Sequence, residues 1–402
     1  MTTLLNLLLT STLAAAFVFS VHGGSSDDPR VTRTTTVATK DKLSGPFSTH
    51  FLTWLETNGY AGYDFSYSDS LGPQASYGGR PDTPTVNSTS NSKRPVIFIH
   101  GNSDGALAFG DHESQQGWST AIEHFQTVGG YSSAELYALT YGDRELANAL
   151  TRRMECHTLL RVRRFIEAVL AYRADSPLVD IVAHSMGVSL VRRAIRGGTV
   201  TEMNVIGGGQ SSCYLGSPLT HRVHTLIGIA GANYGMCLCA NPALSPPNNP
   251  AAEVPACGRY NGFWAGVPHG NAMGSTSCDE GEVARLIERC SATDDSDTTS
   301  QPIHNSGQCQ PSYSTFLREL NEGQKEKEAR QVVSIWSTGD AILGPSNSTF
   351  GQPTSVIPGS DRVVKYEQLS HHELKTRIAS DLLAIIGSES AATDFLKRVV
   401  QL

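Results

Sequence analysis

The segment AHSMG at residues 183–187 follows an apolar run at residues 179–182, and this combination constrains the fold more than any other feature. It predicts a strand that turns sharply into a helix, with Ser185 at the bend. Such a bend holds a hydroxyl clear of neighbouring side chains, and it needs small residues two positions before and after the serine. Ala183 and Gly187 meet that requirement. The alternative is a helix N-terminus with a serine near its cap, because short motifs of this kind also arise by chance.

A second apolar run, residues 95–99 (PVIFI), precedes the serine and leads into a His-Gly-Asn loop. A parallel strand that is covered on both faces has this composition. In α/β-hydrolases the loop after this strand and the residue after the nucleophile each supply one backbone N–H to an oxyanion hole. We therefore expect Ser185 to be the nucleophile and the amides of Asn102 and Met186 to be the oxyanion donors.

Three neighbouring residues have structural interpretations. His100 is expected to be hydrogen-bonded and to hold its loop in place, without a chemical role. Gly101 is expected to let the backbone turn tightly, because glycine adopts conformations that other residues avoid. His184 stands next to the serine at the bend, so its side chain is expected to point away from the reacting groups.

In α/β-hydrolases the acid and the base follow the nucleophile in the order Ser, Asp or Glu, His. A strand-like run ends shortly before Asp340, which we predict to be the acid, with Asp361 as the alternative. A last alternating run leads into His371 and His372. We predict that His371, the first histidine after the strand, is the base. The other histidine is expected to be a solvated residue at the start of a helix.

Six segments of the chain resemble, in family order, those of the class 2 lipases, which are α/β-hydrolases. They are residues 95–104 (PVIFIHGNSD), 131–141 (YSSAELYALTY), 180–187 (DIVAHSMG), 226–235 (LIGIAGANYG), 337–344 (STGDAILG) and 369–373 (LSHHE). The resemblance implies Ser185 as nucleophile, Asp340 as acid and His371 as base. It also implies hydrolysis of carboxylic esters, with long-chain acylglycerols as the expected substrate.

Other functions remain open on the same residues. The triad could transfer acyl groups to an acceptor other than water, or act on short esters or polyesters, because a fold and a triad do not fix the substrate. A binding protein on an inactive hydrolase fold is an alternative of a different class, and the complete set of three residues argues against it. The expected partner is a lipid or another ester, for which a lipid–water interface is one possible setting.

The N-terminal segment predicts export. Residues 4–21 are mostly apolar and end in Val21-His22-Gly23, which suits cleavage by signal peptidase after Gly23. Polar residues interrupt this run, and a membrane anchor needs about 20 cleanly apolar residues. We therefore expect residues 1–23 to be a signal peptide, and the protein to be secreted and extracellular without a stable membrane anchor. The net charge of −7 and the lack of a basic tract argue against a nucleic-acid partner.

Cysteine usage agrees with an oxidising compartment. An even number of cysteines behind a secretory signal predicts disulfides, and there are eight. Cys156 and Cys213 are expected near helices on one face of the sheet, and we predict that they pair. The other six fall between residues 237 and 309, where the pairing stays open. No Cys-x-x-Cys motif supports zinc or redox chemistry, and we expect neither a metal nor a cofactor. Asn87 and Asn347 begin glycosylation sequons, which could also be plain surface loops.

The organisation expected is a flexible segment (24–45) and an α/β-hydrolase catalytic domain (46–402). Strands near 96–100, 134–140, 179–184, 224–230, 331–337 and 362–368 alternate with helical patterns that include 145–174, 187–196 and 370–386. This alternation predicts a mainly parallel central sheet with helices on both faces. Five arginines on the first of these helices are interpreted as a solvated face: Arg152, Arg153, Arg161, Arg163 and Arg164.

The insertion at about residues 236–312 has a different character, with six cysteines and little periodicity. A loop that long within a compact domain is usually functional or disordered, and cysteines argue against disorder. We predict a disulfide-stapled cap near the active site. Its aromatic residues Tyr260, Phe263 and Trp264 could line an acyl-binding surface, with ordinary packing as the alternative.

Overall fold

The computed structural model describes residues 43–82, 93–204, 209–241, 243–246, 252–266, 312–322 and 326–387. The predicted signal peptide, most of the flexible segment 24–45, the sequon at Asn87 and the greater part of the cap insertion lie outside these residues. Within the described ranges, no helix is both long and apolar enough to cross a membrane.

Seven strands form the central sheet, in the order β1-β3-β2-β4-β7-β10-β13. They are β1 (Ser76–Tyr77), β2 (Val96–Ile99), β3 (Leu136–Leu139), β4 (Val179–His184), β7 (Val223–Ile229), β10 (Gln331–Ser337) and β13 (Arg362–Tyr366). Only β1 runs antiparallel to its neighbour, and the other neighbouring pairs in this sheet are parallel. Every residue of β2, β3 and β4 is buried, which explains their continuous apolar runs.

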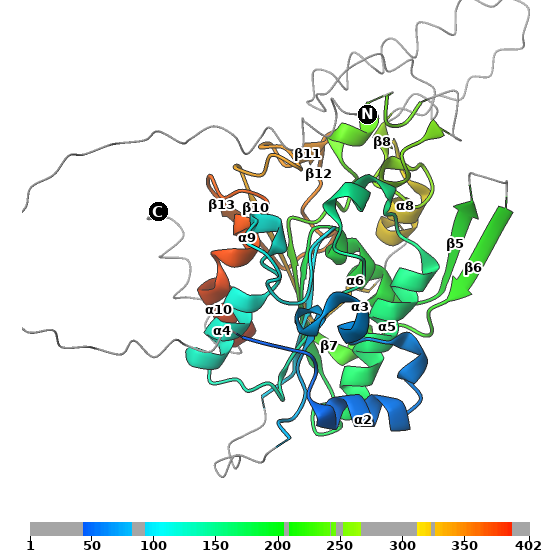
Figure 1. Ribbon diagram of the computed structural model, residues 1–402. Coiled ribbons are helices and arrows are strands. Elements are labelled where there is room, and N and C mark those ends of the chain that lie inside the picture. Colours follow the sequence, from blue (N-terminus) through cyan, green and yellow to red (C-terminus); the bar gives the residue numbers. More distant parts are fainter. Residues whose placement is uncertain are drawn as a thin grey trace, which may run out of the picture. The chain divides into compact units, whose positions relative to one another are not determined.

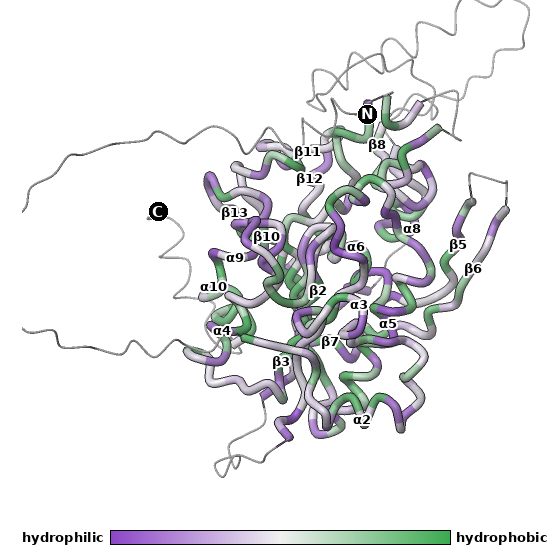
Figure 2. Tube along the Cα trace, viewed as in Figure 1, coloured by the Kyte–Doolittle hydropathy of each residue, from purple (hydrophilic) through white to green (hydrophobic). Residues whose placement is uncertain are grey.

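Helices cover both faces of this sheet (Figure 1). One face carries α2 (Thr49–Thr57), α5 (Cys156–Tyr172) and α6 (Met186–Arg196), and the other carries α4 (Ser119–Thr127) and α10 (Ala379–Gly387). Hydrophobic segments gather in the central strands and in α10 (Figure 2). This architecture is the predicted α/β-hydrolase fold, and it confirms the expectation from the alternating pattern.

Two predicted helices are interrupted. The pattern at 145–174 forms a 3-10 helix, η4 (Leu146–Thr151), and then α5, because Arg152 and Glu155 have extended backbones. The pattern at 370–386 forms α9 (Glu373–Thr376) and then α10. Periodicity alone did not reveal these breaks, since apolar residues continue at helical spacing across both of them.

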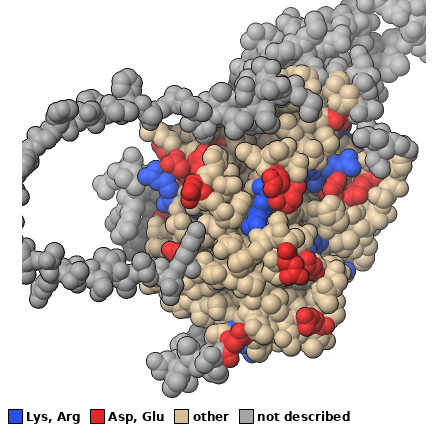
Figure 3. All heavy atoms as spheres, in the orientation of Figure 1, with Lys and Arg blue, Asp and Glu red and all other residues tan. Residues whose placement is uncertain are grey.

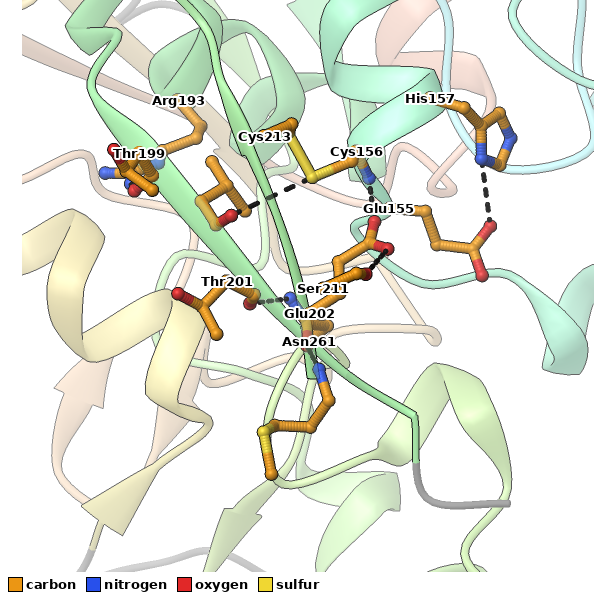
Figure 4. The surroundings of a disulfide bond; sticks show 12 residues. Glu155, Cys156, His157, Arg193, Thr199, Thr201, Glu202, Ser211, Cys213 and Asn261 are labelled. Carbon is orange, nitrogen blue, oxygen red and sulfur yellow. Dashed lines mark hydrogen bonds and ion pairs between the residues drawn. A yellow bond between two sulfur atoms is a disulfide. The ribbon is translucent and has the colours of Figure 1, made fainter. Parts of the chain in front are cut away.

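A hairpin that the sequence did not predict, β5 (Thr199–Asn204) and β6 (Gly209–Tyr214), follows α6. A disulfide between Cys156 and Cys213 ties β6 to the start of α5 (Figure 4). The Glu202 carboxylate of the same hairpin accepts hydrogen bonds from the Cys156 amide and from Ser211 Oγ. The hairpin is thus fastened to the helix that follows η4.

The described ends of the insertion are held together. A short strand β8 (Ala265–Gly266) pairs with β9 (Ser312–Tyr313), and a disulfide joins Cys239 to Cys257. Phe263 and Trp264 are buried, with only 4% and 6% of their surfaces exposed. This burial favours the alternative of ordinary packing for these two aromatics, and the hypothesis that they line an acyl-binding surface stays a prediction.

Charged residues of both signs alternate on the face shown in Figure 3, where Lys and Arg lie close to Asp and Glu. The arginines of α5 are less exposed than the sequence analysis expected. Arg161 donates to the carbonyls of Tyr63 and Asp64, and Arg163 donates to those of Ala194 and Ser217. Both are buried, so the solvated-face interpretation is wrong for them, because their guanidinium groups bind carbonyl oxygens at helix and loop ends.

Asn347 lies in a loop, between β10 and β13, that also holds β11 (Ser348–Thr349) and β12 (Gln352–Pro353). Its side chain is only 4% exposed, and its Oδ1 accepts a hydrogen bond of 2.8 Å from the Ser355 amide. This burial argues against the predicted glycosylation at Asn347 in the folded chain. The sequon pattern contains no information on burial.

Candidate active site

Ser185 stands at the turn between β4 and α6 with φ of 53° and ψ of −128°. A positive φ is unusual for a residue with a side chain and marks a strained backbone. The strain is held by the surrounding structure, since the Ser185 amide donates to the Ile229 carbonyl of the neighbouring strand β7. The predicted strand-turn-helix is therefore present, with the serine at its bend.

Close packing explains the glycines around this bend. A Cβ on Gly187 would stand 2.3 Å from the His100 carbonyl oxygen, so α6 could not approach β2 with a larger residue there. A Cβ on Gly101 would stand 2.9 Å from the Ser185 Cβ. Gly101 is not among the residues with positive φ. The chain turns directly after Gly101, at residues 102–103, and the glycine is needed at this position for close approach to the serine.

The three predicted catalytic residues meet in one hydrogen-bonded chain. His371 Nε2 lies 2.9 Å from Ser185 Oγ, and His371 Nδ1 lies 2.7 Å from Asp340 Oδ2. Both the histidine and the aspartate are nearly buried, with 4% and 3% of their surfaces exposed. A carboxylate accepts hydrogen bonds only, so Nδ1 carries a proton and leaves Nε2 to accept one from the serine hydroxyl.

Asp340 is held in its ionised form. Burial alone would raise its pKa, but the His371 ring and the backbone amides of Ile342 and Leu343 outweigh burial and lower the pKa below its usual value. Both amides donate to Oδ1, at 2.9 and 3.0 Å, which leaves Oδ2 for the histidine. Gly339 permits this turn, since a Cβ there would lie 2.4 Å from the Gln368 carbonyl carbon.

The alternative acid lies at another edge of the sheet, and the alternative base, His372, lies beside His371 with their ring centroids 5.4 Å apart. Asp361 precedes β13, and its carboxylate accepts from the Val332 amide at the start of β10 and from Lys327. It is therefore at the amino ends of these parallel strands, opposite the carboxyl ends that carry the triad. No hydrogen-bond partner of His372 Nδ1 is found in the described part of the protein, and desolvation lowers the pKa of His372 to about 3. The expectation that this histidine is solvated is therefore wrong, because its ring nitrogen is buried.

Two more histidines support the arrangement. His184 Nε2 donates to the His371 backbone carbonyl at 2.9 Å, so it fixes the position of the predicted base. Burial keeps the pKa of His184 well below its ordinary value, and its ring stays neutral. His100 stacks on Tyr141 and accepts a hydrogen bond from the Tyr141 amide at Nε2, which agrees with its structural interpretation.

The predicted oxyanion donors are the Met186 amide, at the start of α6, and the Asn102 amide, in the loop after β2. Neither the Asn102 nor the Met186 amide donates to another group in the described ranges, and a first-turn helix amide has no intrahelical acceptor. The Asn102 side chain is fixed: its Nδ2 donates to Ala149 and its Oδ1 accepts from Arg152, at 2.9 and 2.8 Å. The sequence does not reveal this role of Arg152, because an arginine pair before a helix is usually solvated.

A buried ion pair was also missed. Lys375 of α9 binds Asp104 in the oxyanion loop, and their side chains are only 0% and 2% exposed. Asp104 Oδ1 also accepts from the Gly117 amide at 3.0 Å. The pair joins the oxyanion loop to the segment that carries the predicted base. Asp104 is the last residue of one segment that resembles the lipase family and Lys375 lies just after another, but only the folded chain shows that they meet.

Comparison with known proteins identifies the family of this chain. The family model for "Lipase (class 2)" matches residues 93–384, whereas a search of curated proteins gives no match. Among solved structures, the chain is similar to a soluble variant of the monoglyceride lipase of Saccharomyces cerevisiae, with 14% identity, a TM-score of 0.38 and coverage of 78% of this chain and 90% of that one.

Two further likenesses have similar values. They are to the monoacylglycerol lipase of Paleococcus ferrophilus (12% identity, TM-score 0.36, 77% and 97% covered) and to alpha/beta hydrolase domain-containing protein 10 from mouse (17%, 0.33, 74% and 90%). These identities and TM-scores are low, so membership rests on the family match, which spans both the predicted nucleophile and the predicted base. The chain therefore belongs to the class 2 lipase family of α/β-hydrolases.

Proposed function

We propose that the protein is a serine ester hydrolase of the lipase type, with Ser185 as nucleophile, His371 as base and Asp340 as the acid. One observation carries the proposal: a single imidazole bridges the serine hydroxyl and a buried carboxylate at 2.9 and 2.7 Å. In this arrangement the nucleophile has an adjacent base, and a third group orients that base, as nucleophilic catalysis at an ester carbonyl uses them.

In the proposed mechanism, His371 Nε2 takes the proton from Ser185 Oγ as the oxygen attacks the ester carbonyl carbon. The carbonyl π bond opens, and the oxyanion is stabilised by the amides of Asn102 and Met186. When the tetrahedral intermediate collapses, the ester C–O bond breaks and His371 gives its proton to the leaving alcohol. A water molecule that is deprotonated by the same imidazole then attacks the acyl-enzyme carbonyl. The bond between the acyl carbon and Ser185 Oγ breaks, His371 returns the proton to Ser185 Oγ, and the carboxylic acid is released.

Asp340 keeps the imidazole in the productive tautomer and stabilises its cation during each transfer. The lowered pKa of Asp340 supports this role, because the carboxylate stays ionised while the ring carries its positive charge. The fold and the triad leave the acyl length and the final acceptor open.

The first test is an ester series from acetate to oleate, measured on the full chain with and without an emulsified interface. A lipase shows turnover that rises with acyl length and with the interface, whereas a simple esterase favours the short, dissolved esters. Ser185→Ala should lose turnover by about 10⁶-fold and should no longer be labelled by a fluorophosphonate probe. Wild-type protein that neither takes the label nor cleaves any ester would refute the proposal and favour a binding protein.

We also propose that the protein is exported. The disulfides Cys156–Cys213 and Cys239–Cys257 support this, since such bonds persist in oxidising compartments. Expression of the full chain in secreting cells tests the idea: the medium should contain protein that begins at Gly24. Protein retained inside the cells with its first 23 residues intact would contradict it.

A further inference from the structure

A cavity of about 440 Å³ opens beside the candidate active site. Its walls come from α3 (Ser68–Leu71), the loop after β3, the segment between η4 and α5, and Met186 at the start of α6. The loops after β3 and after β4 lie on either side of β2. At this point the strand order reverses, because the chain adds β3 on one side of β2 and then crosses to add β4 on the other side. Parallel sheets bind their ligands in the crevice at this point, and the volume falls within the range of ligand pockets.

The cavity adjoins the predicted oxyanion hole on one side. Met186 lines it and supplies one of the two expected amides. Arg152 also lines it and donates to Asn102 Oδ1 at 2.8 Å, next to the other amide. An ester whose carbonyl oxygen sits between these amides therefore places one of its two parts, the acyl chain or the alcohol, at the mouth of the cavity.

The lining combines apolar side chains with two ion pairs, and the charges of these pairs are balanced. Arg152 pairs with Asp143, and Arg153 pairs with Glu155 at 3.1 Å. Two guanidinium groups thus face two carboxylates, and no unmatched charge is left to attract an ionic group. An acyl chain would have to remove water from these groups without replacing its hydrogen bonds, which is costly. A neutral group with several hydroxyls can replace those hydrogen bonds.

The same groups remain reachable from the cavity. The side chains of Arg153 and Glu155 are 24% and 32% exposed, and Ser70 of α3 also lines the cavity. Carboxylate oxygens accept from hydroxyls, and guanidinium nitrogens donate to them. The aliphatic side chain of Leu71 adds an apolar surface for the carbon skeleton of the ligand.

We propose that this cavity binds the alcohol part of the substrate, and that this alcohol carries free hydroxyl groups, as the glycerol of a monoacyl ester does. The inference rests on the proposed function and names its preferred substrate class. Arg153 and Glu155 act here as specificity-determining residues that hold the hydroxyls and take no part in proton transfer.

The test compares two esters that share one acyl chain, 1-monodecanoylglycerol and methyl decanoate, on the full-length protein. The wild type should prefer the glycerol ester in kcat/KM. Arg153→Met should lower kcat/KM for the glycerol ester by about 3- to 10-fold, the value of one hydrogen bond, and should leave methyl decanoate unchanged. Ser70→Trp, at an exposed position on the cavity wall, should abolish the preference by filling the space.

Arg164→Met is the matched control. Arg164 belongs to the neighbouring helix α5, pairs with Glu167, and is 32% exposed, but it does not line the cavity. It should leave the ratio of the two kcat/KM values at the wild-type level. Equal kcat/KM for both esters in the wild type, or an equal loss for both esters in Arg153→Met, would overturn the inference while leaving ester hydrolysis intact.

A binding measurement separates this inference from the proposed function. The ether 1-O-decylglycerol cannot be hydrolysed, and its affinity can be measured by calorimetry in the wild type and in Arg153→Met. Weaker binding to the variant supports the cavity even if the protein cleaves no ester. Affinity that is unchanged in the variant rejects the cavity as the site of the hydroxyls.

Discussion

Replacing Asp340 by asparagine tests the candidate site most directly, because the structure dictates how the new side chain sits. Asp340 Oδ1 accepts two backbone amides, at 2.9 and 3.0 Å, and the asparagine oxygen takes over those bonds. The NH₂ group then faces His371 Nδ1, where the carboxylate oxygen was. Two donors cannot face each other, so Nδ1 must lose its proton and Nε2 must carry it.

In that tautomer Nε2 points its N–H at Ser185 Oγ and cannot accept the serine proton. The positive charge that develops on the imidazole also loses its counter-charge. Where this change has been made in a serine protease, kcat falls about 10⁴-fold. The same factor here corresponds to about 5.5 kcal/mol of lost transition-state stabilisation.

The assay is kcat/KM for a dissolved chromogenic ester, with fluorophosphonate labelling as a measure of serine reactivity. Asp361→Asn is the matched control. Its carboxylate binds the Val332 amide and Lys327 at the far ends of the strands, so its activity should stay within about twofold of the wild type while its stability falls slightly. A nearly fully active Asp340→Asn beside an inactive Asp361→Asn would show that the reasoning assigned the wrong carboxylate.

Three further predictions follow from the histidines and from the buried ion pair. His371→Ala should abolish turnover and His372→Leu should keep most of it, and the opposite pattern in an ester assay would move the base by one position. Burial lowers the pKa of His100 to about 4 and that of His372 to about 3. An unfolded histidine titrates near 6.5, so the unfolded chain binds more protons below that pH and the free energy of unfolding falls as the pH drops from about 6.5 toward 4. The free energy of unfolding, measured by urea titration across this range, should fall by about 1 to 3 kcal/mol less in His372→Leu than in the wild type, and parallel curves would contradict the burial argument. Lys375→Met should cost about 3 to 5 kcal/mol in urea unfolding because it leaves Asp104 charged and buried, and the double variant with Asp104→Leu should recover much of that loss; additive losses would show that the two residues are not coupled.

Local signals in the sequence were sufficient for the fold class and for the three residues that meet. Each central strand is an apolar run because both of its faces are covered, and this is visible without any tertiary contact. The small residues around Ser185 and the order Ser, Asp, His are equally local. Even the choice of acid has a local basis, since Asp340 follows its strand whereas Asp361 precedes one, and parallel strands end at the same edge.

Tertiary structure decided everything that depends on which distant groups meet. Arg152 and Arg153 read as a solvated pair, yet one of them fixes Asn102 and both line the cavity beside it. The sequon at Asn347 reads as a surface loop, yet its side chain is buried against Ser355. Patterns along the chain report which face of an element is apolar. They do not show which polar group of a distant segment packs against that element. The hydrogen-bond and ion-pair partners of a buried charge or amide depend on these contacts between distant segments.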